Sequence, residues 1–112
     1  MGIHKDVAHA DKWRERRRGV RLNSRVAVAL DWTPEGGDKQ HVEVHTRMVN
    51  PYGCLVVLSH DLAFEQKVQL TNLATRKAND AVVAWKGSQL HDGREFGIEL
   101  IGPEMDFWGL EL

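Results

Sequence analysis

The chain has 112 residues, of which 42% are hydrophobic and 28% charged, and its net charge is −1. This length suits one domain with a single core, and the composition is that of an ordinary soluble globular protein. No apolar run approaches the roughly 18 residues of a membrane span, and no secretory signal is readable, so we expect a cytoplasmic protein. The single cysteine, Cys54, agrees with a reducing compartment and excludes an internal disulfide and a thiolate zinc site.

Positive charge is concentrated near the N-terminus. Between Lys12 and Arg25, seven basic side chains accompany one acidic side chain, Glu15, so this segment carries +6 and the rest of the chain −7. Such segregation indicates an anionic partner, and arginine suits phosphates and the guanine edge because its guanidinium binds both bidentately. A solvated basic arm without a specific ligand is the alternative interpretation. We assign residues 1–21 to a basic N-terminal arm and residues 22–112 to the folded domain.

Alternating apolar residues predict an all-β domain. Val26, Val28, Leu30 and Trp32 share one face of a first strand, and similar period-two patterns recur along the chain. Turn-forming residues separate the segments, as in Asn50-Pro51-Tyr52-Gly53. Six short strands favour a closed or nearly closed antiparallel barrel, because closure removes exposed edges. The expected strands cover residues 25–32, 39–49, 54–58, 66–72, 78–86 and 94–101, and the expected loops include residues 87–93.

Two further features of the core are predicted. The run from Cys54 to Leu58 is continuously apolar, as in a strand buried on both sides. Trp32, Trp85 and Trp108 fall on apolar faces or in the apolar tail, so we expect them in the core rather than stacked on a ligand. The short apolar C-terminal tail, residues 104–112, should cover one mouth of the barrel or a dimer partner.

Neither catalysis nor metal binding has support in the sequence. His41 and His45 share a strand face, but strand rise separates them by about 13 Å, which is too far for one metal ion. No serine stands in a nucleophile elbow, and Cys54 in its apolar run is more typical of an inert core thiol. We therefore expect a protein that is not an enzyme and that needs no cofactor or metal.

The arginine arm and the turn at Asn50 together resemble the PilZ domain family, whose pattern is RxxxR followed later by (D/N)xSxxG. Arg17 and Arg21 match the two arginines of the first motif, and Arg18 is an adjacent candidate. Arg14/Arg18 and Arg21/Arg25 fit the same spacing. The resemblance extends from about Trp13 to Trp108. It implies a six-stranded antiparallel barrel that is a receptor for cyclic di-GMP, with the arginines gripping guanine edges and phosphates.

The second motif departs from the family pattern. Aligning Gly53 with the family's glycine places Asn50 at the serine position and Met48 at the aspartate or asparagine position. Asparagine can replace a hydroxyl as donor and acceptor, whereas a thioether is a weak acceptor. Met48 then either belongs to the ligand site, which we favour, or is the last inward residue of the strand that contains Val44. The resemblance implies this set of ligand-binding residues: Arg17, Arg18, Arg21, Met48, Asn50 and Gly53.

Three functional hypotheses follow. The first is a bacterial signalling domain that binds cyclic di-GMP and passes the signal to an unidentified protein partner without chemical turnover. The second is a degenerate PilZ-like adaptor that has lost nucleotide binding and acts through its apolar tail. The third is a binder of single-stranded nucleic acid, for which only Trp13 and Tyr52 offer aromatic rings beside the arginines. We therefore expect neither DNA nor a membrane as partner, and a homodimer remains open.

Overall fold

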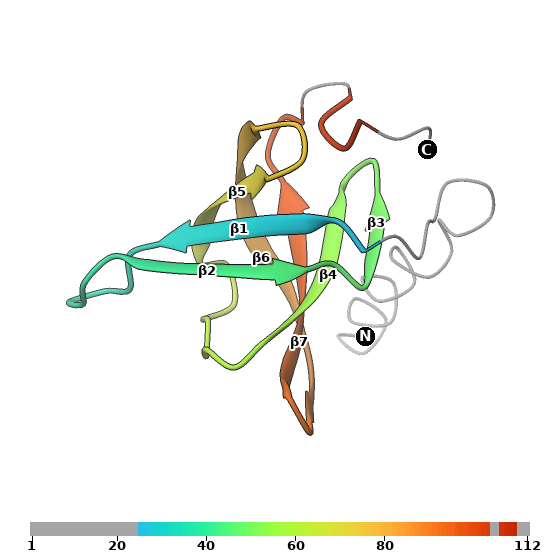
Figure 1. The fold of residues 1–112 in the computed structure, drawn as a ribbon. Helices are drawn as coiled ribbons and strands as arrows, with labels where there is room; N and C mark the ends of the chain where they lie inside the picture. Colours follow the sequence, from blue (N-terminus) through green and yellow to red (C-terminus); the bar gives the residue numbers. More distant parts are fainter. Residues whose placement is uncertain (1–24, 104–105, 110–112) are drawn as a thin grey trace, which may run out of the picture.

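A computed structural model describes residues 25–103 and 106–109, and within them every helix or strand is a β-strand, which confirms the predicted all-β fold. Neighbouring strands are antiparallel in the order β2-β1-β5-β6-β7-β4-β3, and the sheet curls into a half-barrel (Figure 1). No helix in this described part has the length and apolarity to cross a membrane. The strands are β1 (Ala27–Trp32), β2 (Gln40–His45), β3 (Met48–Asn50), β4 (Gly53–Leu58), β5 (Lys67–Asn72), β6 (Lys77–Leu90) and β7 (Gly93–Leu100).

The sheet has seven strands rather than the predicted six because the expected strand 39–49 bends in the middle. Its first half, β2, pairs with β1, and its second half, β3, pairs with β4 at the other end of the sheet. At the bend, the Thr46 N–H donates to the Val26 carbonyl at 2.9 Å and the Arg47 N–H donates to the Leu55 carbonyl at 2.8 Å. One bent segment thus links both ends of the sheet, which forms a half-barrel rather than the predicted closed or nearly closed barrel.

The core consists largely of the faces that the alternation predicts. Val28, Leu30 and Trp32 of β1 are all exposed by 6% or less. In β4, every residue from Gly53 to Leu58 is buried except the half-buried Val57, which confirms a strand covered on both sides. Removal of so much apolar surface from water is the main stabilising term of a small barrel. The other strands and the link before β5 contribute Val49, Leu62, Val68, Leu70, Ala81, Val83, Phe96, Ile98 and Leu100.

Residues 87–93 do not form the predicted loop. β6 continues to Leu90 and β7 begins at Gly93, which lies opposite it, so only two residues turn the chain. The resulting hairpin projects well beyond the rest of the sheet (Figure 1). Gly93 has a φ of 140°, and a Cβ there would lie 2.4 Å from the Leu58 carbonyl oxygen, so glycine permits this close approach to β4. The polar residues of this segment reflect the exposure of the hairpin rather than the absence of a strand.

The prediction that Trp85 lies in the core is wrong. Val83 pairs with Ile98 and Trp85 with Gly97, so an extra residue bulges from β6 between these pairs. The bulge buries Ala84 beside Val83 and leaves Trp85 half-buried, because one inserted residue shifts the alternation to the other face. The Trp85 ring then lies over Gly87, where an added Cβ would come within 2.7 Å of it.

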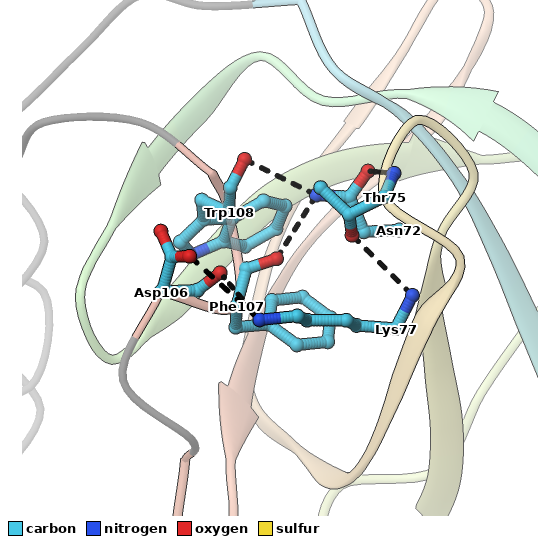
Figure 2. A network of polar contacts seen from close by, with 6 residues as sticks. All are labelled: Asn72, Thr75, Lys77, Asp106, Phe107 and Trp108. Atoms are coloured by element: carbon cyan, nitrogen blue, oxygen red, sulfur yellow. Dashed lines mark hydrogen bonds and ion pairs between the residues drawn. The ribbon is translucent and has the colours of Figure 1, made fainter.

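Asp106, Phe107, Trp108 and Gly109 of the tail pack onto the barrel, and we call them the clasp. Phe107 and Trp108 are 2% and 4% exposed and join the core, with their rings edge to face at 4.9 Å. The prediction that the tail covers part of the barrel is confirmed for these residues. Their anchor is Asn72, whose Nδ2 donates to the carbonyls of Phe107 and Trp108 at 3.1 and 3.3 Å (Figure 2). Because Asn72 is fully buried, these bonds satisfy a donor that would otherwise be costly.

Candidate functional site

The β3–β4 hairpin brings together the three residues of the predicted second motif. Asn50 and Gly53 pair across its turn, and Met48 pairs with Leu55. The Asn50 carboxamide oxygen accepts a hydrogen bond of 2.7 Å from the Tyr52 N–H, so the side chain closes its own turn. The turn predicted for these residues is therefore confirmed.

Burial differs strongly within this hairpin. Asn50 is only 1% exposed, its carbonyl accepts a 2.9 Å hydrogen bond from Trp108 Nε1, and its Nδ2 has no hydrogen-bond partner among the described residues. Met48 is half-buried and does not belong to the core, whereas the adjacent Val49 is fully buried. The inward face therefore passes from Thr46 to Val49 across the bend, and Met48 is not the last inward residue of its strand.

An open groove of about 320 Å³ lies beside the bend between β2 and β3. It adjoins Arg25, where the described chain begins, and Arg47, which directly precedes Met48 in sequence. The groove therefore lies between Arg25, the first described residue, and Arg47, the residue before the second motif. Its lining consists of Arg25, Val44, His45, Thr46, Arg47, Val57 and Asp92.

Two arginines and one carboxylate line the groove, so its charged groups sum to +1. Arg25, His45 and Arg47 are exposed, and the one carboxylate is Asp92 from the β6–β7 turn. A guanidinium nitrogen of Arg47 lies 3.2 Å from a carboxylate oxygen of Asp92, and the two side chains are 51% and 61% exposed. An ion pair this exposed contributes at most about 1 kcal/mol, so a more highly charged anion can compete for Arg47. The groove is thus chemically suited to phosphate.

The predicted arginines Arg17, Arg18 and Arg21 lie outside the described residues, as does the expected domain boundary after residue 21. The structure brings Met48, Asn50 and Gly53 together in one hairpin. Sequence reasoning did not single out Arg47 as a binding residue. Its position in the sequence could have identified it, because it directly precedes the second motif and the basic segment already indicated an anionic ligand.

Two titratable residues outside the groove have perturbed pKa values. The ring nitrogens of His41 lie 2.6 Å from Asp31 and 3.2 Å from Glu43, and these hydrogen bonds, that to Asp31 first, raise the pKa of His41. Burial raises the pKa of the Cys54 thiol, and the side chain lies in the core as predicted. Within residues 25–103 and 106–109, no group of three or more His, Cys, Asp or Glu side chains is placed to hold a metal ion.

Comparison with known proteins supports the fold. No family model matches the chain, and no curated protein matches it. Among solved structures, the chain is similar to the inhibitor of motility MotI/DgrA of Bacillus subtilis, with a TM-score of 0.59 and 17% identity. The match covers 84% of this chain and 46% of the other, so this chain spans less than half the length of that protein.

The described chain is thus a curled antiparallel β-sheet with a PilZ-like fold. MotI/DgrA is a PilZ-domain protein, so the structural match agrees with the family resemblance of the sequence. At 17% identity the likeness concerns the fold alone. The chemistry of the groove and of the β3–β4 hairpin must carry any statement about function.

Proposed function

We propose that this chain is a PilZ-like receptor domain of the bacterial cytoplasm that binds cyclic di-GMP and acts on a protein partner, without catalysing a reaction. The nucleotide occupies the groove beside the bend between β2 and β3. Arg17, Arg18 and Arg21 reach it from the arm, and Met48, Asn50 and Gly53 flank it from the hairpin. Arg47 adds a phosphate contact from the bend.

The observation that carries this proposal is the position of the groove. The two arginines that line it are close in sequence to the two predicted motifs. Arg25 follows Arg21 by four residues, and Arg47 directly precedes Met48. A phosphodiester in the groove can accept paired hydrogen bonds from arginine. Guanine can accept them at its O6 and N7 atoms. A cyclic dinucleotide of guanosine offers both kinds of acceptor in one molecule.

A degenerate adaptor that does not bind the nucleotide is the second candidate, and one observation favours it. Asn50, at the motif's serine position, is buried, and its side-chain oxygen is already bonded within its own turn. Met48 supplies only a weak acceptor at the preceding motif position. In this case the apolar C-terminal tail, residues 104–112, would serve the contact with a protein partner.

Calorimetric titration with cyclic di-GMP distinguishes the two candidates. We expect the wild-type chain to bind, and Arg17→Ala and Arg21→Ala each to lose at least about 1–3 kcal/mol of binding free energy, as for a lost bidentate contact. Thermal stability should barely change in these variants, because both arginines lie outside the apolar pattern.

The groove supplies a matched set of controls. Arg47→Ala should weaken binding, whereas Asp92→Asn should strengthen it, because it removes a competing carboxylate and releases Arg47. Lys67→Ala changes an exposed cation on β5, away from the groove, and should leave affinity unchanged. Wild-type affinity in both arm variants would refute the assigned site, and absence of binding by the wild-type and all variants would favour the adaptor.

A further inference from the structure

The clasp and the second motif meet at Asn50. The indole N–H of Trp108 donates to the Asn50 carbonyl at 2.9 Å. The Asn50 side chain is 1% exposed in this arrangement, so its amide N–H groups cannot reach a ligand in solution. A residue that the proposed function needs for nucleotide binding is therefore enclosed while the clasp is docked.

The docked arrangement also leaves a polar group unsatisfied. Asn50 Nδ2 is buried without a hydrogen-bond partner among the described residues. Buried amide donors are normally paired, so this one favours any rearrangement that supplies an acceptor. A phosphate or guanine oxygen is such an acceptor. Burial of Phe107 and Trp108 opposes the rearrangement, because both rings would return to water.

The far end of the clasp is held weakly. Lys77 Nζ lies 3.4 Å from the Asp106 carbonyl and 3.7 Å from its carboxylate, in an exposed pair (Figure 2). Asp106 itself has a φ of 72°, a left-handed conformation that is unfavourable for a residue other than glycine. The main anchors are thus the two apolar rings, the buried Asn72 and the Trp108–Asn50 bond.

We propose that the clasp is an autoinhibitory contact that encloses Asn50, so that clasp docking and cyclic di-GMP binding oppose each other. This inference rests on the proposed function. Nucleotide binding pairs Asn50 Nδ2 and releases Trp108, and the released clasp exposes apolar surface that a protein partner can recognise. By reciprocity, bound nucleotide weakens clasp docking by the same factor as the docked clasp weakens nucleotide binding, so a variant with a weaker clasp must bind the nucleotide more tightly.

The test uses the full chain and two tryptophan variants. Trp108→Phe keeps an aromatic ring in the core but removes the N–H that bonds Asn50, and Trp32→Phe is the control, since it removes an indole N–H from a buried tryptophan of β1. Calorimetry should show cyclic di-GMP binding on the order of fivefold or more tighter in Trp108→Phe, and unchanged in Trp32→Phe. In the wild-type chain, saturating nucleotide should speed hydrogen exchange of the Trp108 indole N–H.

Each outcome decides the inference. Binding by Trp108→Phe alone, or tighter than wild-type, supports it. Equal or weaker binding in Trp108→Phe, with unchanged exchange at Trp108 in the saturated wild-type, overturns the clasp and leaves the proposed function standing. Absence of binding by both the wild-type and Trp108→Phe overturns both. If Trp108→Phe fails to fold, the exchange measurement on the wild-type chain decides alone.

Discussion

At the scale of single residues, His41 lies between two carboxylates that alter its pKa. Its two ring nitrogens face Asp31 and Glu43, so the protonated ring can donate to both carboxylates and its pKa rises above the ordinary value of 6.5. This contribution to stability is complete below the unfolded pKa and is lost as pH rises through the folded pKa. NMR titration should place the midpoint of His41 above 6.5 in the wild-type chain.

Asp31→Asn is the variant that tests this assignment. It removes the larger of the two hydrogen-bond effects and should bring the His41 midpoint down, while Glu43→Gln should lower it less. The ring is exposed, so we expect only a small change in overall stability from either variant. An unchanged midpoint in Asp31→Asn would show that the short His41–Asp31 contact does not persist in solution.

Met48 and its neighbour Val49 form a matched pair for the second motif. Met48 is half-buried and outside the core, so Met48→Asp should cost no more than about 1 kcal/mol, and cyclic di-GMP affinity should hold or rise because the carboxylate accepts hydrogen bonds from guanine. Val49→Asp places an unpaired charge in the core and should cost several kcal/mol. Melting temperature and calorimetry report the two effects separately.

A large fall in melting temperature for Met48→Asp, without any gain in affinity, would contradict its placement at the ligand site. The sequence left this residue open, because period-two alternation alone placed Thr46 and Met48 on one face. The structure decides the facing through the bend at Arg47, where the chain leaves β1 and joins β4.

At the scale of elements, the strands were predictable and their irregularities were not. Alternation identified β1, β5 and β7 because each keeps one register along its described pairing with a neighbour. Alternation placed Trp85 in the core, but a bulge in β6 turns this side chain to the other face of the sheet. A bulge arises from pairing with the partner strand, and the period-two pattern of one strand carries no information about that pairing. The strand ends within residues 87–93 were missed for a different reason. An exposed hairpin needs no buried face, so its polar residues show no apolar alternation.

The bulge predicts different costs for two tryptophans. Trp32 is 6% exposed, with its ring edge to face on His60 at 5.5 Å, so Trp32→Ala should destabilise the domain by about 3–5 kcal/mol. Trp85 is half-buried outside the core, so Trp85→Ala should cost clearly less, about 1–2 kcal/mol. Urea denaturation of both variants measures the difference. Equal losses would mean that the β6 bulge is misplaced and that Trp85 faces inward.

At the scale of the whole molecule, the sequence predicted the fold better than the site. The all-β class, the antiparallel pairing and the covering tail follow from alternation, turns and apolar content, and the structure agrees with each. The motif residues Met48, Asn50 and Gly53 could be named, but not the burial of Asn50. Nor could the contact of Asn50 with Trp108 be predicted, because the two residues are 58 positions apart and no local pattern connects them.

Charge segregation distinguishes a dinucleotide receptor from a binder of nucleic-acid strands. The segment from Lys12 to Arg25 carries +6, whereas the rest of the chain carries −7. A long polyanion would be attracted by the basic segment and repelled by the acidic remainder of the chain. A cyclic dinucleotide has only two phosphates, so the basic segment and the groove can bind it alone. Strand binding would also release many counterions and weaken steeply with salt, with a slope of about −0.7 per phosphate contacted.

We therefore expect cyclic di-GMP affinity to fall only modestly between about 50 and 200 mM salt, as for about two neutralised phosphates. A single-stranded oligonucleotide of about 20 bases should bind weakly at low salt and lose nearly all affinity at the higher concentration, because the acidic body repels it. Fluorescence anisotropy of the labelled strand and calorimetry of the dinucleotide measure the two slopes. Tight strand binding that survives the higher salt, together with no binding of the dinucleotide, would instead establish the basic arm as a nucleic-acid contact.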